Sequence, residues 1–261
     1  MMQLLIIDAL NLIRRLYAVQ EQRNSTEQAV LVATSAAVTQ AAKRLLHQFK
    51  PTHVVAVFDG APIGFRHHLY PDYKAGRKPM PTALAEYLPQ LQQDLWMLGI
   101  DALLSDTDEA DDLIATLAAT LSRHGKSSVI MSTDQGFCQL LNPHIQLWDH
   151  FNQTALTAPL AQQKFGLQVH QLVDYWALTG VSGSHIKGVP SIGPKRAKSL
   201  LTRWHSLDQL LAANSQDKAE QVVISHKENA LLARQLVKLV DDIELGFNLQ
   251  DIRHHSLSNR S

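Results

Sequence analysis

The chain of 261 residues has little cysteine, no net charge and no long apolar run. Its single cysteine, Cys138, excludes an internal disulfide and fits a reducing compartment. Lys+Arg and Asp+Glu number 24 each, so the global charge favours no class of partner. The start, "MMQLLIIDAL", lacks a basic region, and no segment approaches the roughly 20 apolar residues of a membrane span. We expect a cytoplasmic protein without membrane attachment, and a monomer, since nothing in the sequence indicates an oligomer.

Acidic residues are missing from one long stretch. Residues 180–201, "GVSGSHIKGVPSIGPKRAKSLL", contain neither Asp nor Glu, but hold four glycines and two prolines within their first fifteen residues. This density of turn residues predicts a tight loop held against a ligand. The basic, amphipathic residues that follow predict a helix directly after the loop.

Short apolar runs alternate with helical patterns along the first 160 residues. The predicted strands span Gln3–Asp8, 53–59, 127–134 and 145–149. The predicted helices span about 28–50, about 82–98 and a segment that opens with "DEADD". This alternation predicts an α/β fold with a mostly parallel central sheet. From about residue 160 onward only helices are expected, and the tail 253–261 is expected to be disordered.

The first three predicted strands end in the aspartates Asp8, Asp59 and Asp134. The carboxyl ends of parallel strands meet at one edge of a sheet, which is where ligands bind in open α/β folds. A single aspartate there would fit a turn or a helix cap, and Asp106 with Glu109 matches a capping box.

The "DEADD" segment adds further acids at the start of a helix: Glu109, Asp111 and Asp112. Six carboxylates that converge on one crevice would repel one another strongly unless a cation neutralised them. Ligation by carboxylates alone points to Mg²⁺ or Mn²⁺ rather than zinc. No Cys or His spacing supports a zinc site, so four histidines are interpreted as surface residues: His67, His68, His254 and His255.

Residues 66–79, "RHHLYPDYKAGRKP", form a basic strip with interleaved tyrosines. A solvated loop would explain any one of these residues, but basic side chains also suit nucleic-acid phosphates and tyrosines suit unstacked bases. Next to an acidic metal crevice, the strip predicts metal-assisted cleavage of a phosphodiester. Lys74 and Arg77 would offset the charge that develops on the scissile phosphate.

Six motifs occur in a characteristic order: "IIDALN", "VFDG", "RHHLYPDYKAGRKPMP", "DEADDL", "STDQGFCQL" and "GVPSIGPKRA". In this order, over about residues 3–240, the chain resembles structure-specific 5′ nucleases, which include flap endonucleases and the 5′-nuclease domains of bacterial DNA polymerase I. The resemblance implies an α/β metal-binding core over residues 1–160, with a basic arch at about 62–98. It also implies a helical DNA-binding subdomain over 161–261 that contains a helix–three-turn–helix hairpin.

The resemblance also implies roles for individual residues. The first metal site would comprise Asp8, Asp59, Glu109, Asp111, Asp112 and Asp134. The arch would supply the catalytic residues Tyr73, Lys74 and Arg77. A potassium ion would be held by the backbone carbonyls of Leu178, Thr179, Lys187, Val189 and Ile192, which need no side-chain acid. DNA would be contacted by Arg66, Ser191, Ile192, Gly193, Pro194, Lys195 and Arg196.

The chain departs from the family pattern at three positions, where Gly136, Val181 and Ser184 stand in place of the usual aspartates. The second metal site is therefore incomplete, and we expect one ion held directly by protein, with a second reached only through water or the substrate phosphate. The preferred hypothesis is a Mg²⁺-dependent 5′ flap endonuclease of DNA replication or repair. A DNA-binding protein without useful catalysis is the first alternative. An RNA-cleaving relative is the second, and the hairpin and the basic arch argue against it.

Overall fold

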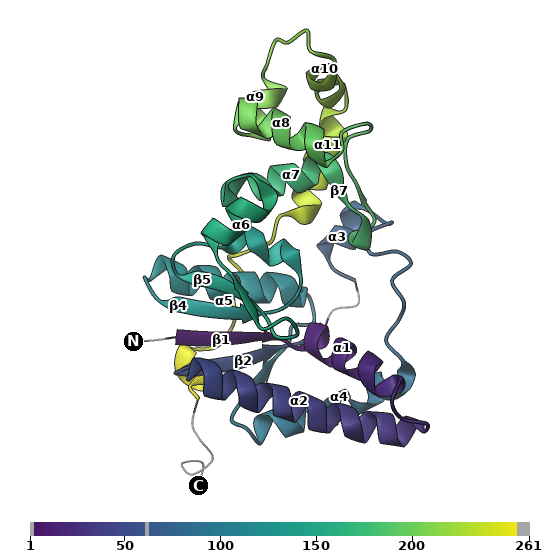
Figure 1. Ribbon diagram of the computed structural model, residues 1–261, viewed down its shortest axis with the longest axis vertical. Helices are drawn as coiled ribbons and strands as arrows, with labels where there is room; N and C mark the ends of the chain where they lie inside the picture. Colours follow the sequence, from purple (N-terminus) through teal and green to yellow (C-terminus); the bar gives the residue numbers. More distant parts are fainter. Residues whose placement is uncertain (1–2, 61–62, 255–261) are drawn as a thin grey trace.

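The computed structural model describes residues 3–60 and 63–254 (Figure 1). A six-stranded sheet with its covering helices forms the lower part of the molecule in Figure 1, and a group of helices forms the upper part. The strands lie in the order β3-β2-β1-β4-β5-β6. Their bounds are β1 Gln3–Asp8, β2 His53–Val57, β3 Asp101–Leu103, β4 Ser127–Met131, β5 Ile145–Asp149 and β6 Thr154–Leu156. All neighbours pair in parallel except β5 and β6, which confirms the predicted mostly parallel α/β sheet.

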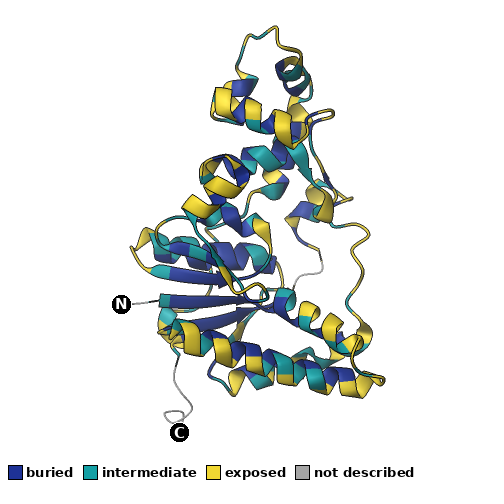
Figure 2. Ribbon diagram, viewed as in Figure 1, coloured by how far each residue is buried: buried dark blue, intermediate teal, exposed yellow. Residues whose placement is uncertain are grey.

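Both faces of the sheet are covered by helices because successive side chains of a strand point to opposite faces. Leu5 and Ile7 of β1 pack with α1 Ala9–Glu21, α2 Glu27–Phe49 and α4 Thr82–Trp96. Leu4 and Ile6 pack on the other face with α5 Ala110–Arg123 and the 3₁₀ turn η1 Gln135–Leu140, and this second core continues into the helical part. Figure 2 shows the mostly buried central strands β1, β2 and β4 between the two layers. Burial of each such side chain contributes about 1.5–3 kcal/mol.

The helices next to the sheet begin where strand-end acids can cap them. Asp8 accepts a hydrogen bond from the backbone N–H of Asn11, so it caps α1, a helix that is not among the predicted elements. The first N–H of α5, that of Ala110, donates to Asp59 Oδ1 at 2.9 Å. The helix begins after Glu109, whose side chain makes no capping hydrogen bond, so the alternative of a capping box with Asp106 is wrong.

The predicted arch, apart from residue 62, which lies outside the described residues, consists of the short helix α3 Phe65–Leu69, a series of turns, an extended stretch and α4. The turns contact the helical part, because the backbone N–H of Lys74 donates to the Ser184 carbonyl at 2.9 Å. The extended stretch contacts the core, because Arg14 donates to the Lys78 carbonyl at 2.8 Å. The arch is therefore attached to both parts of the molecule.

The helical part comprises α6 Ala158–Phe165, α7 Leu172–Thr179, α8 Pro194–Trp204, α9 Leu207–Leu211, α10 Lys218–Ser225 and α11 Lys227–Val237. The expectation of helices alone is wrong at one place, where β7 Gly180–Val181 pairs with β8 Ile186–Lys187 as a small hairpin. Two glycines make this hairpin possible. A Cβ on Gly188 would lie 2.4 Å from the Leu178 carbonyl oxygen and 2.4 Å from the Gly180 nitrogen, so the backbones touch here.

After α11 the chain returns to the core. The 3₁₀ turn η4 Leu249–Ile252 packs on β2, and His254 donates its backbone N–H to the Thr52 carbonyl at 3.0 Å. Arg253 and His254 are therefore ordered, contrary to the expected disordered tail, and the rest of that tail, with His255, lies outside the described residues. Over residues 3–60 and 63–254, no helix combines the length and apolar composition needed to cross a membrane.

Candidate active site

Four aspartates, Asp8, Asp59, Asp111 and Asp134, form an acidic cluster at the carboxyl ends of the central strands. Asp8 ends β1, is only 7% exposed, and accepts a hydrogen bond from Ser132 Oγ at 2.6 Å. Asp59 and Asp134 follow β2 and β4, and Asp111 lies in the first turn of α5. Parallel strands end at a common edge, which explains why acids far apart in the sequence meet here.

Burial and charge repulsion raise the pKa of two members of the acidic cluster, Asp8 and Asp111. The pKa of Asp8 rises from its ordinary 3.8 to about 7, first because the side chain is buried and then because Asp134 and Asp59 repel its charge. Burial also raises the pKa of Asp111, and repulsion from the three other aspartates adds to it, against the attraction of Lys74. A cation among these carboxylates would relieve the repulsion.

The acidic cluster fits a hard divalent cation in charge and in donor chemistry, since carboxylate oxygens are the ligands that Mg²⁺ and Mn²⁺ prefer. In the described part of the chain, however, no three Asp, Glu, His or Cys side chains lie close enough together to enclose an ion. Oxygen atoms from water or from a substrate would therefore have to complete the coordination shell.

Lys74 brings a positive charge to the edge of the acidic cluster. Its Nζ lies 2.5 Å from Glu109 Oε2 and 3.9 Å from Asp111 Oδ2. Tyr73, which is buried, donates its hydroxyl to the same Glu109 oxygen at 3.1 Å. Burial alone would raise the pKa of Glu109, but the charge of Lys74 holds it below its ordinary value. Burial alone would lower the pKa of Lys74, but Asp111, Tyr73 and Glu109 raise it, so the ammonium stays protonated at neutral pH.

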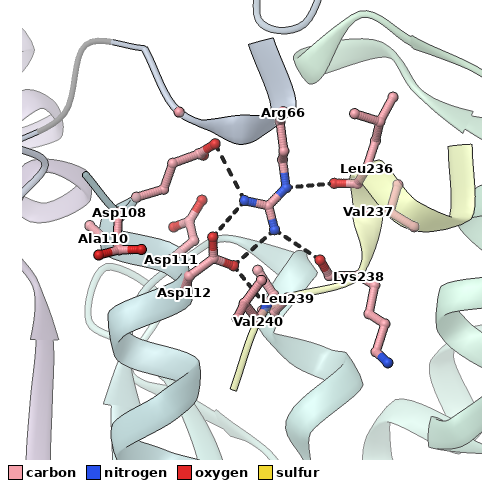
Figure 3. A network of polar contacts seen from close by, with 12 residues as sticks. Arg66, Asp108, Ala110, Asp111, Asp112, Leu236, Val237, Lys238, Leu239 and Val240 are labelled. Atoms are coloured by element: carbon pink, nitrogen blue, oxygen red, sulfur yellow. Dashed lines mark hydrogen bonds and ion pairs between the residues drawn. The ribbon is translucent and has the colours of Figure 1, made fainter. Parts of the chain in front are cut away.

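Arg66 and Asp112 form a buried ion pair next to this group (Figure 3). The guanidinium donates to both Asp112 oxygens, at 2.6 and 2.8 Å, and Asp112 also accepts the backbone N–H of Val240. Arg66 is 1% exposed and Asp112 is 2% exposed. The structure thus differs from two expectations: burial keeps Arg66 away from DNA, and three of the roughly four acceptor positions of Asp112 are already filled.

Arg77, which is predicted to offset charge on the scissile phosphate, contacts the small hairpin in the helical part. It is exposed, and its Nε donates to the carbonyl of Gly183 in the β7–β8 hairpin at 3.3 Å. Of the three residues predicted to be catalytic, the structure therefore brings Tyr73 and Lys74 to Glu109, and it places Arg77 at the contact between arch and hairpin.

A cavity of about 310 Å³ opens beside Asp111 and Asp134. The three positions where the chain departs from the family pattern all line it: Gly136, Val181 and Ser184. Much of the remaining wall is apolar, from Phe137, Trp176, Ile186, Leu236, Val237 and Leu239. The absent acids would thus have faced one shared space, and in this chain that space offers a second ion few anionic ligands.

The loop before α8 and the first turn of α8 expose most of the residues predicted to bind DNA: Ser191, Gly193, Pro194, Lys195 and Arg196. Ile192 differs, because its side chain is buried and its backbone N–H already donates to the Val189 carbonyl at 3.1 Å. The Ile192 amide is therefore not free to meet a phosphate.

The carbonyls predicted to hold potassium surround the same loop. The Leu178 carbonyl accepts the N–H of Val189 at 2.9 Å, and the Val189 carbonyl accepts that of Ile192. Each carbonyl oxygen has two lone pairs, so each retains one acceptor position. A role for these carbonyls in ion binding stays a prediction.

Two family sequence models together match nearly the whole chain. The 5′-3′ exonuclease N-terminal resolvase-like domain matches residues 3–166, and the 5′-3′ exonuclease C-terminal SAM fold matches residues 167–260. The chain belongs to the 5′-3′ exonuclease family. This confirms the resemblance seen in the sequence.

Relatives of similar length share about half of the residues. The flap endonuclease Xni of Aeromonas hydrophila subsp. hydrophila is 54% identical over 96% of this chain and 95% of its own. The protein of that name from Vibrio cholerae serotype O1 is 45% identical over 98% of both chains. Among solved structures, the T5 D15 protein co-crystallised with metal ions superposes with a TM-score of 0.76 over 91% of this chain and 90% of its own. At 18% identity, that likeness concerns the fold alone.

Two polar residues of the site, Ser132 and Asn11, are not among the predicted site residues. Ser132 bridges two aspartates, since its Oγ donates to Asp8 and accepts the N–H of Asp134. Asn11 accepts hydrogen bonds from both the N–H and the hydroxyl of Thr133, which joins the start of α1 to the end of β4. Their positions within three residues of a strand-end aspartate are the signal that could have identified them.

Proposed function

We propose that this protein is a Mg²⁺-dependent, structure-specific nuclease that hydrolyses DNA at 5′ flaps during replication or repair. The observation that carries the proposal is the acidic cluster beside Lys74, at the junction of the two domains that define the family. The names of the relatives, flap endonuclease Xni, support the choice of substrate. We propose that the enzyme acts as a monomer in the cytoplasm.

The carboxylates of the acidic cluster would hold the divalent cation. Asp111 would be a main ligand, since its carboxylate accepts no hydrogen bond from the described residues and its side chain lines the cavity. The bound ion would supply Lewis-acid activation of the scissile phosphate and of the attacking water. Mn²⁺ would serve in the same position. Gly136, Val181 and Ser184 add no acid to the cavity wall, which supports one ion held by protein, with a second reached only through water or the substrate phosphate.

Lys74 would stabilise the charge that develops on the scissile phosphate. Its ammonium is positioned by Glu109 and remains protonated, so little reorganisation is needed when the phosphate arrives. Tyr73 would fix the Glu109 carboxylate for this purpose. Arg77 would guide the displaced strand from its exposed position in the arch, next to the hairpin.

The helical region from about residue 161 would bind the duplex through the loop before α8. Exposed Lys195 and Arg196 lie in the first turn of α8, where the helix dipole favours a phosphate. A K⁺ ion between the loop carbonyls would stabilise the turn without any side-chain acid. Removal of Lys195 and Arg196 should lower the salt slope of duplex binding by about 0.9 for each phosphate that is no longer neutralised. Affinity should also be higher in K⁺ than in a large organic cation at equal ionic strength.

A substrate panel tests the proposed function. A 5′ flap, a 3′ flap, a plain duplex, a single strand and an RNA duplex are incubated with the protein at varied Mg²⁺. We expect metal-dependent cleavage of the 5′ flap above all others, and Asp111→Ala should abolish it while DNA affinity is kept. Preferential cleavage of RNA, or equal cleavage of every DNA, would contradict the proposal.

One alternative function has a specific observation in its favour. The acidic residues do not enclose an ion in the described part of the chain, and the Lys74 ammonium already neutralises Glu109. A DNA-binding protein without catalysis would have these features. The same panel separates the two functions, because this alternative predicts tight flap binding with no cleavage at any Mg²⁺ concentration.

A further inference from the structure

The Arg66 guanidinium is satisfied by protein groups alone. Its Nε donates to the Leu236 carbonyl at 2.9 Å, and one terminal nitrogen donates to the Lys238 carbonyl at 2.8 Å. The remaining bonds go to both oxygens of Asp112 and, at 3.3 Å, to Glu109 Oε1. These contacts match the five N–H donors of an arginine. No donor is left for a phosphate.

The partners of Arg66 belong to segments that are far apart in the sequence. Asp112 opens α5, whereas the two carbonyls belong to the return segment, defined here as residues 236–240, where α11 ends and the chain turns back to the core. Asp112 also accepts the N–H of Val240, and Gln139 bonds to both Val237 and Leu239. Figure 3 shows the guanidinium between Asp112 and the carbonyls of Leu236 and Lys238. Arg66 therefore joins α3, α5 and the return segment.

A continuous chain of contacts leads from this junction to the acidic cluster. Glu109 accepts Arg66 on one oxygen, and Lys74 on the other. Lys74 in turn lies 3.9 Å from Asp111. A shift of the guanidinium would move the Glu109 carboxylate and, with it, the ammonium that faces Asp111. Small displacements of a catalytic group are expensive, since about 1 Å can cost on the order of 100-fold in rate.

We infer that Arg66 is a positioning residue, which acts through Glu109 to place Lys74 beside Asp111, and that Asp112 is the counterion of Arg66 rather than a metal ligand. This inference rests on the proposed nuclease function. It assigns to both residues roles that differ from those expected from the sequence. It also makes the return segment part of the support of the active site.

The first test is Arg66→Lys. Arg123→Lys serves as a matched control, because Arg123 is an arginine at the far end of α5 that forms an exposed ion pair with Asp241. Lysine keeps the charge but cannot make the directional set of five bonds. We expect the single-turnover rate on a 5′ flap to fall at least about tenfold. Flap affinity in EDTA should change less than threefold, and the control should change neither quantity. Equal losses of rate and affinity would overturn the inference, because they would mark Arg66 as a phosphate contact.

The second test is Asp112→Asn, with Asp111→Asn for comparison, and its readout is the affinity for Mn²⁺ without DNA. We expect Asp112→Asn to slow cleavage at least about tenfold but to change Mn²⁺ affinity less than threefold. Asp111→Asn should weaken Mn²⁺ binding at least about tenfold. Equal losses of Mn²⁺ affinity in both variants would identify Asp112 as a ligand and overturn the inference.

The two proposals can fail separately. If the unmodified protein cleaves no flap, the proposed function fails, while the Mn²⁺ titrations still decide whether Asp112 is a ligand. Folding of each variant is checked by urea unfolding. If Arg66→Lys does not fold, Asp112→Asn alone tests the inference. Slow cleavage with unchanged Mn²⁺ affinity would support it, and a loss of Mn²⁺ affinity equal to that of Asp111→Asn would overturn it.

Discussion

Replacement of Asp8 by asparagine should stabilise the metal-free protein, and only at high pH. The asparagine would be neutral at every pH, while its amide oxygen could still accept the N–H of Asn11 and keep the cap of α1. The aspartate, in contrast, is buried and repelled by Asp134 and Asp59 once it ionises. The substitution therefore removes an unfavourable charge and leaves the capping interaction in place.

The structure gives the sign and the size of the effect. With a pKa of about 7 in the folded state against an ordinary 3.8, Asp8 keeps its proton in the folded protein over a range where the unfolded chain has released it. The folded state then binds more protons, so stability falls as the pH rises from about 4 to about 7. At 1.36 kcal/mol for each pKa unit, the loss is about 4 kcal/mol. Asp8→Asn should not show this loss, because asparagine does not ionise.

Urea unfolding in EDTA at pH 4, 5, 6, 7 and 8 measures the prediction. The free energy of unfolding of Asp8→Asn minus that of the unmodified protein should rise by about 4 kcal/mol across the series. Asp72→Asn, at an exposed position in the arch, serves as the matched control and should give a flat difference. A flat difference for Asp8→Asn would refute the reasoning, because it would show that Asp8 is not held in a repulsive, buried environment.

Three further results are expected. Lys74→Ala should lower the single-turnover rate by about 100-fold but should lower DNA affinity by less than about threefold, because the charge of Lys74 matters most in the transition state. Equal losses of rate and affinity would show that Lys74 is an ordinary phosphate contact. Gly188→Ala should lower the free energy of unfolding by about 1–3 kcal/mol. Gly183→Ala is the control and should leave it unchanged, because a Cβ at Gly183 meets no atom within 4 Å. Equal stabilities of the two variants would contradict the hairpin packing. The double variant Val181→Asp, Ser184→Asp should bind two Mn²⁺ ions without DNA, where the unmodified protein binds one. An unchanged number would contradict the inference that the missing acids at the cavity wall prevent a second ion from binding.

Local patterns predict the central sheet and the positions of its terminal acids well. An apolar run such as "QLLIID" carries both the strand and the aspartate that ends it, and the common edge of parallel strands then brings Asp8, Asp59 and Asp134 together. The short edge strands β3 and β6 are harder to predict, because three residues carry too little periodicity. Helix α1 is missed although Leu12, Ile13 and Tyr17 follow the helical spacing.

Side-chain pairing over long sequence distances cannot be predicted in the same way. Arg66 stands in a basic strip that suggests DNA, yet its partners lie 46 residues away at Asp112 and 170 residues away at Leu236. No local pattern in the sequence encodes these contacts. The close contact between the backbones at Gly180 and Gly188 is equally hard to predict, since the sequence shows the glycines but not which backbone atoms they face. An exposed arginine can bind a phosphate, whereas a buried arginine that is fully hydrogen-bonded to protein can only position other groups. Burial depends on how the whole chain packs, so the local sequence does not distinguish the two roles.

The most direct test of the proposed function is a single-turnover assay on a 5′-flap duplex, with protein in saturating excess and Mg²⁺ as the variable. Unmodified protein and Asp111→Asn are compared, and flap affinity is measured in parallel in EDTA. We expect cleavage that requires Mg²⁺, a rate at least about 100-fold lower for Asp111→Asn, and equal affinities. Cleavage by Asp111→Asn at the rate of the unmodified protein would contradict the proposal, because the acidic cluster would then not be the site of the chemistry.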